Sequence, residues 1–132
     1  MHKTEILVVD DEPTVRNICA AVIRRNGYNP VLATNGAEGL DLFLERRQQI
    51  CLVLSDVSMP EMDGIAMVSK IFETHPHANV IIMSGHHLNV LIPDEFHKLC
   101  AVLEKPFTPV QLMAAIKKCL DYEREAHSLA VC

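Results

Sequence analysis

Five residues with side chains suited to phosphoryl-group chemistry each follow a short apolar run in this chain: Asp10, Asp11, Asp56, Ser84 and Lys105. Carboxylates gathered in one place favour a hard divalent cation with oxygen ligands, and Mg²⁺ is the natural candidate because it needs few protein ligands and keeps several waters. A lysine ammonium group and a hydroxyl group can stabilise the negative charge on a phosphoryl group during its transfer. Whether these residues act together depends on the elements that carry them.

The apolar runs that precede these residues predict strands buried on both faces. Ile6–Val9, Leu52–Leu54 and Val80–Met83 are mostly branched and show no alternation with polar residues, which is typical of a parallel sheet covered by helices. Weaker runs at Pro30–Ala33 and Ala101–Leu103 supply an edge strand and a last strand. We therefore expect a sheet of five strands, one for each of these runs.

Between these runs, apolar residues recur at three- and four-residue steps, the spacing that gives a helix one apolar face. Pro13 suits the first turn of the first helix, and Gly27 suits its end. Thr108 and Pro109 suit the N-cap and the first position of the last helix. Pro93 argues for a short or broken helix before the last strand. The clear apolar stripes are Val15–Ile23, Leu40–Leu44, Ile65–Phe72 and Leu112–Leu120.

The alternation of strands and helices predicts an α/β fold, (βα)5, with a doubly wound five-stranded parallel sheet, since strand–helix–strand units connect right-handedly. The carboxyl ends of the strands then meet at one edge, ~4.8 Å apart, where such sheets bind ligands. Two carboxylates ~5 Å apart repel by about 3 kcal/mol at an effective dielectric constant of ~20, so a cation is favoured there. Asp56 is central among the strand ends and is the best candidate for a nucleophile that forms an acyl phosphate.

Each of these residues also has an ordinary structural interpretation on its own. Paired aspartates after a strand are commonly solvated or cap a helix. Asp56 precedes a proline-containing loop that it could help to turn. Ser84-Gly85 is an ordinary turn sequence, and Lys105-Pro106 is an ordinary break between a strand and a helix. The functional interpretation is favoured because all of these residues fall at strand carboxyl ends in one topology.

Four stretches of the sequence resemble the signature blocks of response-regulator receiver domains, in matching order and separation. The resemblance covers the chain from about Glu5 to Leu120, and it implies a flavodoxin-like receiver fold with the strand order 2-1-3-4-5. The four stretches are Leu7–Pro13, Asp56–Gly64, Met83–Gly85 and Glu104–Phe107.

The resemblance implies a phosphoacceptor and a metal site. Asp56 corresponds to the phosphoacceptor of the family. Asp11, Asp56 and the backbone carbonyl of Ser58 correspond to direct ligands of Mg²⁺ (or Mn²⁺), and Asp10 reaches the metal mainly through water. Ser58 and His86 occupy two variable positions that tune the lifetime of the phosphoryl group in the family.

The resemblance also implies how the phosphoryl group is bound and sensed. Lys105 takes the place of the phosphate-binding lysine, followed by a cis Lys105–Pro106 peptide bond. Ser84 takes the place of the Thr or Ser that moves towards the phosphoryl group. Val102 departs from the pattern, because many receivers carry there an aromatic residue that rotates inward on activation. We therefore expect the movement of the Ser84 hydroxyl to be coupled to the protein surface by a different route, or only weakly.

The resemblance implies a phosphorylation-dependent signalling switch rather than a turnover enzyme. A sensor histidine kinase or a histidine phosphotransfer protein donates the phosphoryl group in this family. A downstream protein then binds the fourth helix, fifth strand and fifth helix, here about Leu88–Cys119. We expect a receiver domain over residues 1–125 and a C-terminal tail over residues 126–132, as a monomer or weak dimer. Met1 and the lack of a linker-like tail favour a stand-alone receiver; the alternative is the receiver portion of a hybrid histidine kinase or multidomain regulator.

The composition argues against several other classes of protein. With a net charge of −5 and no Lys/Arg cluster, the chain is not expected to bind nucleic acid or a membrane surface. The first apolar run is too short for a signal peptide or a membrane span, so we expect a cytoplasmic protein. The five cysteines lack metal-ligand spacing and are expected to be reduced, structural thiols. The histidines are expected to be solvated residues of loops and helix ends, except His86, which should border the acidic pocket.

Three alternative functions fit less well. A phosphohydrolase of the haloacid-dehalogenase type needs a second Asp two residues after its nucleophile to act as acid and base, but Ser58 stands there. A flavodoxin-like FMN binder needs a phosphate loop rich in Ser, Thr and Gly after the first strand, which this sequence lacks. A receiver-like domain that only docks, without phosphorylation, is disfavoured because every chemical position is filled.

Overall fold

The strands of this protein form one all-parallel sheet. The computed structural model describes residues 3–57, 64–85 and 99–131, with side chains as far as residue 120. Within this part of the chain the strand order is β2-β1-β3-β4-β5, which confirms the predicted order 2-1-3-4-5. The strands are β1 (Glu5–Val9), β2 (Asn29–Ala33), β3 (Ile50–Asp56), β4 (Val80–Ser84) and β5 (Ala101–Glu104).

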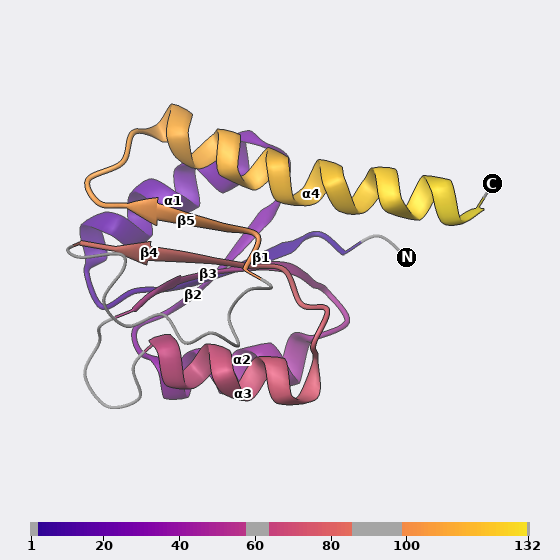
Figure 1. The fold of residues 1–132 in the computed structure, drawn as a ribbon. Helices are drawn as coiled ribbons and strands as arrows, with labels where there is room; N and C mark the ends of the chain where they lie inside the picture. Colours follow the sequence, from indigo (N-terminus) through magenta and orange to yellow (C-terminus); the bar gives the residue numbers. More distant parts are fainter. Residues whose placement is uncertain (1–2, 58–63, 86–98, 132) are drawn as a thin grey trace.

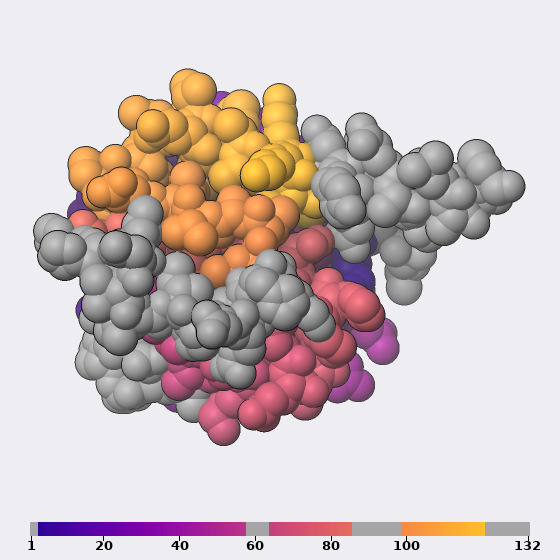
Figure 2. Space-filling view, in the orientation of Figure 1, coloured from indigo at the N-terminus to yellow at the C-terminus, as the bar shows by residue number. Residues whose placement is uncertain are grey.

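Helices cover both faces of the sheet and give the molecule three layers (Figure 1). Helices α1 and α4 lie over one face, and α2 and α3 lie over the other; Figure 2 shows the start of α4 and α3 at opposite sides of the surface. The expected short helix around Pro93 falls outside the described residues. None of the described helices is long and apolar enough to cross a membrane. The helices are α1 (Pro13–Arg25), α2 (Gly36–Arg46), α3 (Gly64–Thr74) and α4 (Pro109–Val131).

Successive residues of the central strand β1 face opposite layers of the core. Ile6 and Val8 pack in the cluster beneath α1 and α4, whereas Leu7 and Val9 pack in the cluster beneath α2 and α3. Each of these side chains is fully buried. The unbroken apolar run therefore predicted burial on both faces correctly.

Hydrogen bonds and backbone geometry at the helix ends match the predicted caps. Thr108 Oγ1 accepts from the Gln111 N–H at 3.1 Å, and Gln111 Oε1 accepts from the Thr108 N–H at 2.9 Å. This reciprocal pair is a capping box before Pro109, the first residue of α4. α1 begins at Pro13, and Gly27, with φ of 85°, lies just beyond its end. These caps fix where the chain turns between the sheet and the helices.

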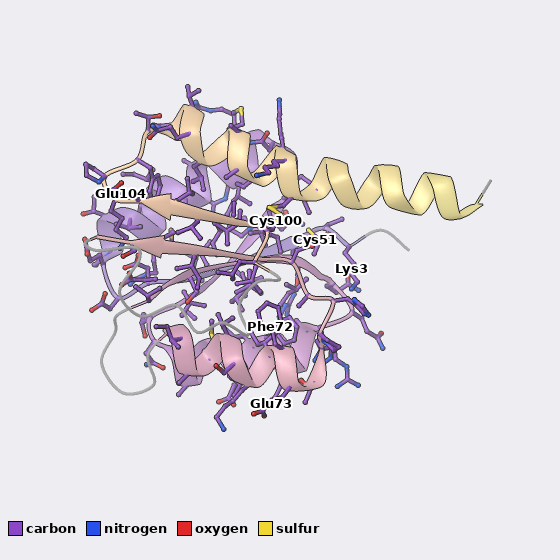
Figure 3. All side chains as sticks on the ribbon, viewed as in Figure 1. Lys3, Cys51, Phe72, Glu73, Cys100 and Glu104 are labelled. Atoms are coloured by element: carbon purple, nitrogen blue, oxygen red, sulfur yellow. A yellow bond between two sulfur atoms is a disulfide. The ribbon has the colours of Figure 1, made fainter. Side chains whose placement is uncertain are left out.

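The structure contradicts the prediction that all cysteines are reduced thiols. Cys100, just before β5, and Cys119, in α4, form a disulfide with a Cα–Cα distance of 5.7 Å, which is ordinary for such a bond (Figure 3). Their sequence separation of 19 gives no sign of pairing, because only the packing of α4 beside β5 brings them together. Cys19 and Cys51 are not disulfide-bonded, as predicted, and burial raises the pKa of the Cys19 thiol to about 12.

Candidate functional site

The carboxyl ends of the strands meet at one edge of the sheet, where the arrowheads of β4 and β5 point in Figure 1. Asp10, Asp56 and Lys105 lie at this edge, at the ends of their strands or directly after them. The fold therefore brings together side chains that are up to 95 residues apart in the sequence, as the hydrogen bond between Lys105 and Asp10 shows. The register pairs at the edge are Val9–Ser55, Asp56–Met83 and Ser84–Glu104.

Asp10 is fully buried and is held by the start of α1. The Glu12 N–H donates to Asp10 Oδ1 at 2.9 Å, and Arg16 Nη1 donates to the Asp10 backbone carbonyl at 2.6 Å. Sequence reasoning gave Arg16 no role. The sequence feature that could have identified Arg16 is its distance from Asp10 and Asp11. A cationic side chain about one turn into the following helix can reach back to the end of the strand. Arg16 thus anchors the turn that positions the aspartates.

Asp56 ends β3 and is only 6% exposed. The Val57 N–H donates to Asp56 Oδ1 at 3.0 Å, and Ser55 Oγ donates to the Asp56 backbone carbonyl at 2.9 Å. Helix α3 starts directly against this carbonyl, since a Cβ atom added at Gly64 would overlap the Asp56 oxygen. Sequence reasoning noticed Gly64 only as part of a signature block, and the structure shows that the close approach requires a glycine.

The carboxylates of Asp10, Asp11 and Asp56 form a cluster. Each offers one oxygen, and these oxygens lie within 4.8 Å of one another. Asp10 and Asp56 are buried, whereas Asp11 is exposed, so the cluster is open to solvent on the Asp11 side. Buried carboxylates this close repel one another, and a donor set of oxygens alone fits Mg²⁺ or a similar hard cation.

Lys105 places its ammonium group among these carboxylates. Its Nζ lies 2.8 Å from Asp10 Oδ2, 3.5 Å from Asp56 Oδ1 and 3.8 Å from Glu12 Oε1. The Lys105 N–H also donates to the Ser84 carbonyl at 2.7 Å, which joins the ends of β5 and β4. With a side chain only 14% exposed, Lys105 offsets part of the negative charge at close range.

Burial and the neighbouring charges shift the pKa values of Asp56 and Lys105. Burial raises the pKa of the Asp56 carboxyl to about 6, and the charge of Lys105 opposes this shift only in part. Burial alone would lower the pKa of Lys105, but its hydrogen bond to Asp10 and the charges of Asp10 and Asp56 outweigh burial and raise it. Lys105 therefore stays protonated, while Asp56 takes up a proton near pH 6 in the absence of metal.

The structure places two of the other residues that the sequence singled out. Ser84 ends β4 and is 4% exposed. Val102 lies on β5 with 39% of its surface exposed, in the position that the resemblance assigns to an aromatic residue. Ser58 and His86 fall outside the described residues. The metal-binding and phosphoryl-binding roles given to the site residues stay predictions.

A largely apolar hollow of about 380 Å³ lies beside Lys105. Val15 and Ile18 of α1 line one side, and Pro106 and Phe107 of the loop after β5 line the other. Ile18 is 41% exposed, which is high for a large apolar side chain. The Lys105–Pro106 peptide bond is cis, as predicted. An exposed apolar hollow of this kind, next to the acidic site, is suited to contact with another protein.

Comparison with known proteins identifies the family. The family model described as "Response regulator receiver domain" matches residues 6–117. This chain therefore belongs to the response regulator receiver family, a family of signalling switches in two-component systems, and the resemblance seen in the sequence is confirmed.

Two curated relatives show how the chain compares in sequence. It is 32% identical over 125 residues to a putative NtrX-like response regulator of Rickettsia bellii, covering 92% of this chain and 26% of the relative. It is 32% identical over 119 residues to the sensor kinase CckA of Brucella abortus, covering 88% of this chain and 12% of the kinase. The chain thus spans about a quarter or less of the length of these relatives.

Solved structures confirm the fold. A response regulator receiver domain protein from Clostridium thermocellum superposes with a TM-score of 0.84 at 30% identity, covering 93% of this chain and 98% of that one. The response regulator TrrA of Thermotoga maritima, solved in complex with Mg²⁺–BeF, superposes with a TM-score of 0.77 at 27% identity, covering 88% of this chain and 98% of that one.

Proposed function

We propose that this receiver is switched by transfer of a phosphoryl group from a phosphohistidine of a sensor kinase or phosphotransfer protein to Asp56. The observation that carries the proposal is the buried Asp56 carboxylate, which has the Lys105 ammonium group 3.5 Å away and two further carboxylates beside it. An aspartate that only ends a strand does not require a nearby cation and two neighbouring carboxylates. A carboxylate nucleophile, a fixed cation and a cation-binding donor set are the parts that phosphoryl transfer requires.

The chain's own residues account for most of the transfer step. A deprotonated Asp56 oxygen attacks phosphorus, the bond between phosphorus and the histidine nitrogen breaks, and the nitrogen keeps its electron pair. Lys105 then pairs with an oxygen of the new acyl phosphate, and Ser84 donates its hydroxyl hydrogen to another. Asp11, Asp56 and, through water, Asp10 would hold Mg²⁺ or Mn²⁺, together with the backbone carbonyl of Ser58. That metal supplies charge neutralisation at the phosphoryl oxygens.

The hollow beside Lys105 is where we place the phosphodonor protein. Its apolar lining borders the acidic cluster, so a helix that carries the phosphohistidine can pack on Ile18 and Phe107 while its imidazole reaches Asp56. The phosphorylated protein would then signal through protein contacts, as a monomer or weak dimer, without binding nucleic acid or membrane. The predicted output face includes Val102 and Val110, which are 39% and 76% exposed. Part of that face, about Leu88 to Lys98, lies outside the described residues.

The proposal also covers whether the receiver stands alone or belongs to a longer protein, and where in the cell it is located. Because relatives include a sensor kinase many times longer than the matched segment, both a stand-alone receiver and a receiver within a hybrid kinase or multidomain regulator accommodate the same chemistry. We place the protein in the cytoplasm, and we retain a receiver domain over residues 1–125 followed by a tail over residues 126–132. The switch is not a turnover enzyme, since the phosphoryl group stays on Asp56 until hydrolysis.

Incubation with acetyl phosphate and Mg²⁺, followed by intact-mass analysis, tests this function. We expect one added phosphoryl group on the wild type and none on Asp56→Asn. Asp41→Asn is the matched control, because it removes an exposed carboxylate of α2 and should leave phosphorylation unchanged. An unmodified wild type with Mg²⁺ bound would instead support the alternative of a domain that only docks.

A further inference from the structure

A second hollow lies at the edge of the sheet opposite the aspartate cluster, and we propose that it binds the phosphate group of a small organic phosphate. Its volume is about 300 Å³, at the lower end of the range for small-molecule pockets. It opens where β3 and β4 begin. Lys3 and Cys51, which line it, lie in Figure 3 at the end of the molecule away from Glu104. The hollow is therefore separate from the proposed phosphorylation site.

The polar lining of this hollow is basic. Lys3, Arg47, His75 and His77 contribute to it, and none of the described residues that line it is Asp or Glu. This gathering runs against the net charge of −5 of the whole chain. Lys3 and Arg47 are exposed, and neither forms an ion pair within the described part of the chain. Their charges match a phosphate monoester, which carries about −1.5 to −2 at neutral pH.

The carboxylate at the start of β1 already has a partner. Glu5 Oε1 accepts from Arg46 Nε at 2.8 Å, and Glu5 Oε2 accepts from Arg46 Nη2. The hydrogen bonds from Arg46 lower the pKa of the Glu5 carboxyl, so it stays ionised and paired. Glu5 therefore neutralises Arg46 and leaves the neighbouring Arg47 available for a ligand, with the planar fork that suits phosphate oxygens.

The inner wall of the hollow is apolar and ordered. Phe43 and Ile50 are each 4% exposed, and the His75 ring packs edge-on against Phe43 with centroids 5.0 Å apart. His75 Nδ1 also lies 2.7 Å from Thr74 Oγ1, which fixes the ring from a second side. A preordered ring loses little entropy when a ligand binds. An apolar wall beneath a basic rim suits a phosphate that carries an apolar group better than a bare ion.

Titration of ¹⁵N-labelled protein with phenyl phosphate, at constant ionic strength and without divalent cations, tests the proposal. We expect saturable amide shifts at Arg47, Ile50, His75 and residues 77–79, with weaker binding of inorganic phosphate. Arg47→Gln should weaken binding by about tenfold or more, the effect of losing a charged hydrogen bond. Arg25→Gln removes the same charge from the exposed end of α1 and should leave the affinity unchanged.

Three results would overturn the proposal. They are shifts that do not saturate, equal affinity in Arg47→Gln and the wild type, and equal affinity for phenyl phosphate and inorganic phosphate. A fourth result, shifts confined to Val57, Ser84 and Lys105, would place the phosphate at the aspartate edge and would also reject the second site. None of these results affects the phosphorylation of Asp56, because that test uses the opposite edge of the sheet.

Discussion

At the scale of single residues, Asp56 is a carboxylate that the fold buries at a cost in stability. Burial raises its pKa from the ordinary value of 3.8 to about 6. Protonated Asp56 is therefore favoured in the folded state, and this contribution to stability is fully present below about pH 4 and is lost as the pH rises through about 6. Ionised Asp56 is tolerated at neutral pH because Lys105, and a metal when bound, offset its charge.

The pH dependence yields a prediction for metal-free protein. Asp56→Asn should raise the free energy of unfolding by roughly 1–3 kcal/mol at pH 7.5, because it removes a buried charge. The gain should shrink towards pH 4, where Asp56 is already protonated. Urea unfolding in EDTA at both pH values measures this, with Asp41→Asn as the exposed control. A gain of equal size at both pH values would contradict the burial argument.

Gly64 is the residue that lets α3 start against the phosphoacceptor. Because an added Cβ would overlap the Asp56 carbonyl oxygen, Gly64→Ala should lower the free energy of unfolding by about 1–3 kcal/mol. Gly85→Ala is the matched control, since its Cβ would meet no atom of the described residues within 4 Å, and it should change stability by less than about 0.5 kcal/mol. Equal stability of the two variants would show that α3 can withdraw from Asp56 without loss.

At the scale of elements, the Cys100–Cys119 disulfide ties the start of β5 to α4, both part of the predicted output face. Closing a loop with a sequence separation of 19 should contribute about 3 kcal/mol of stability, so reduction or Cys100→Ser should cost about that much. Alkylation of unreduced, denatured protein followed by peptide mapping should leave Cys100 and Cys119 unlabelled. Cys51→Ser is the control, since it also replaces a cysteine by serine but leaves the Cys100–Cys119 disulfide intact. Full labelling of Cys100 and Cys119 would show that the bond does not form.

At the scale of the whole molecule, the sequence predicted the sheet because its strands are buried on both faces and read as unbroken apolar runs. Strand bounds were less exact. β3 runs from Ile50 to Asp56, so it begins two residues before the apolar run Leu52–Leu54 and ends, as expected, in the buried polar residues Ser55 and Asp56. Hydrophobicity alone cannot reveal such residues, although their place at a strand end did identify Asp56 as a candidate.

Specific contacts between helices and the sheet could not be predicted from the sequence. The disulfide, the bond from Arg16 to Asp10 and the fit of Gly64 against Asp56 each join residues from different elements, so they depend on how helices pack on the sheet. That the five candidate residues gather at one edge of the sheet was predictable for a different reason. In a parallel sheet the topology alone brings strand ends to one edge, whatever the details of packing.

The central claim is that Asp56, and no other carboxylate of the cluster, receives the phosphoryl group. Reduction of the phosphorylated protein with borohydride converts an acyl-phosphorylated aspartate to homoserine, and peptide mass mapping then locates it. The account predicts homoserine at position 56 alone, formed only when Mg²⁺ is present during phosphorylation. Homoserine at position 10 or 11, or phosphorylated protein without any homoserine, would contradict it.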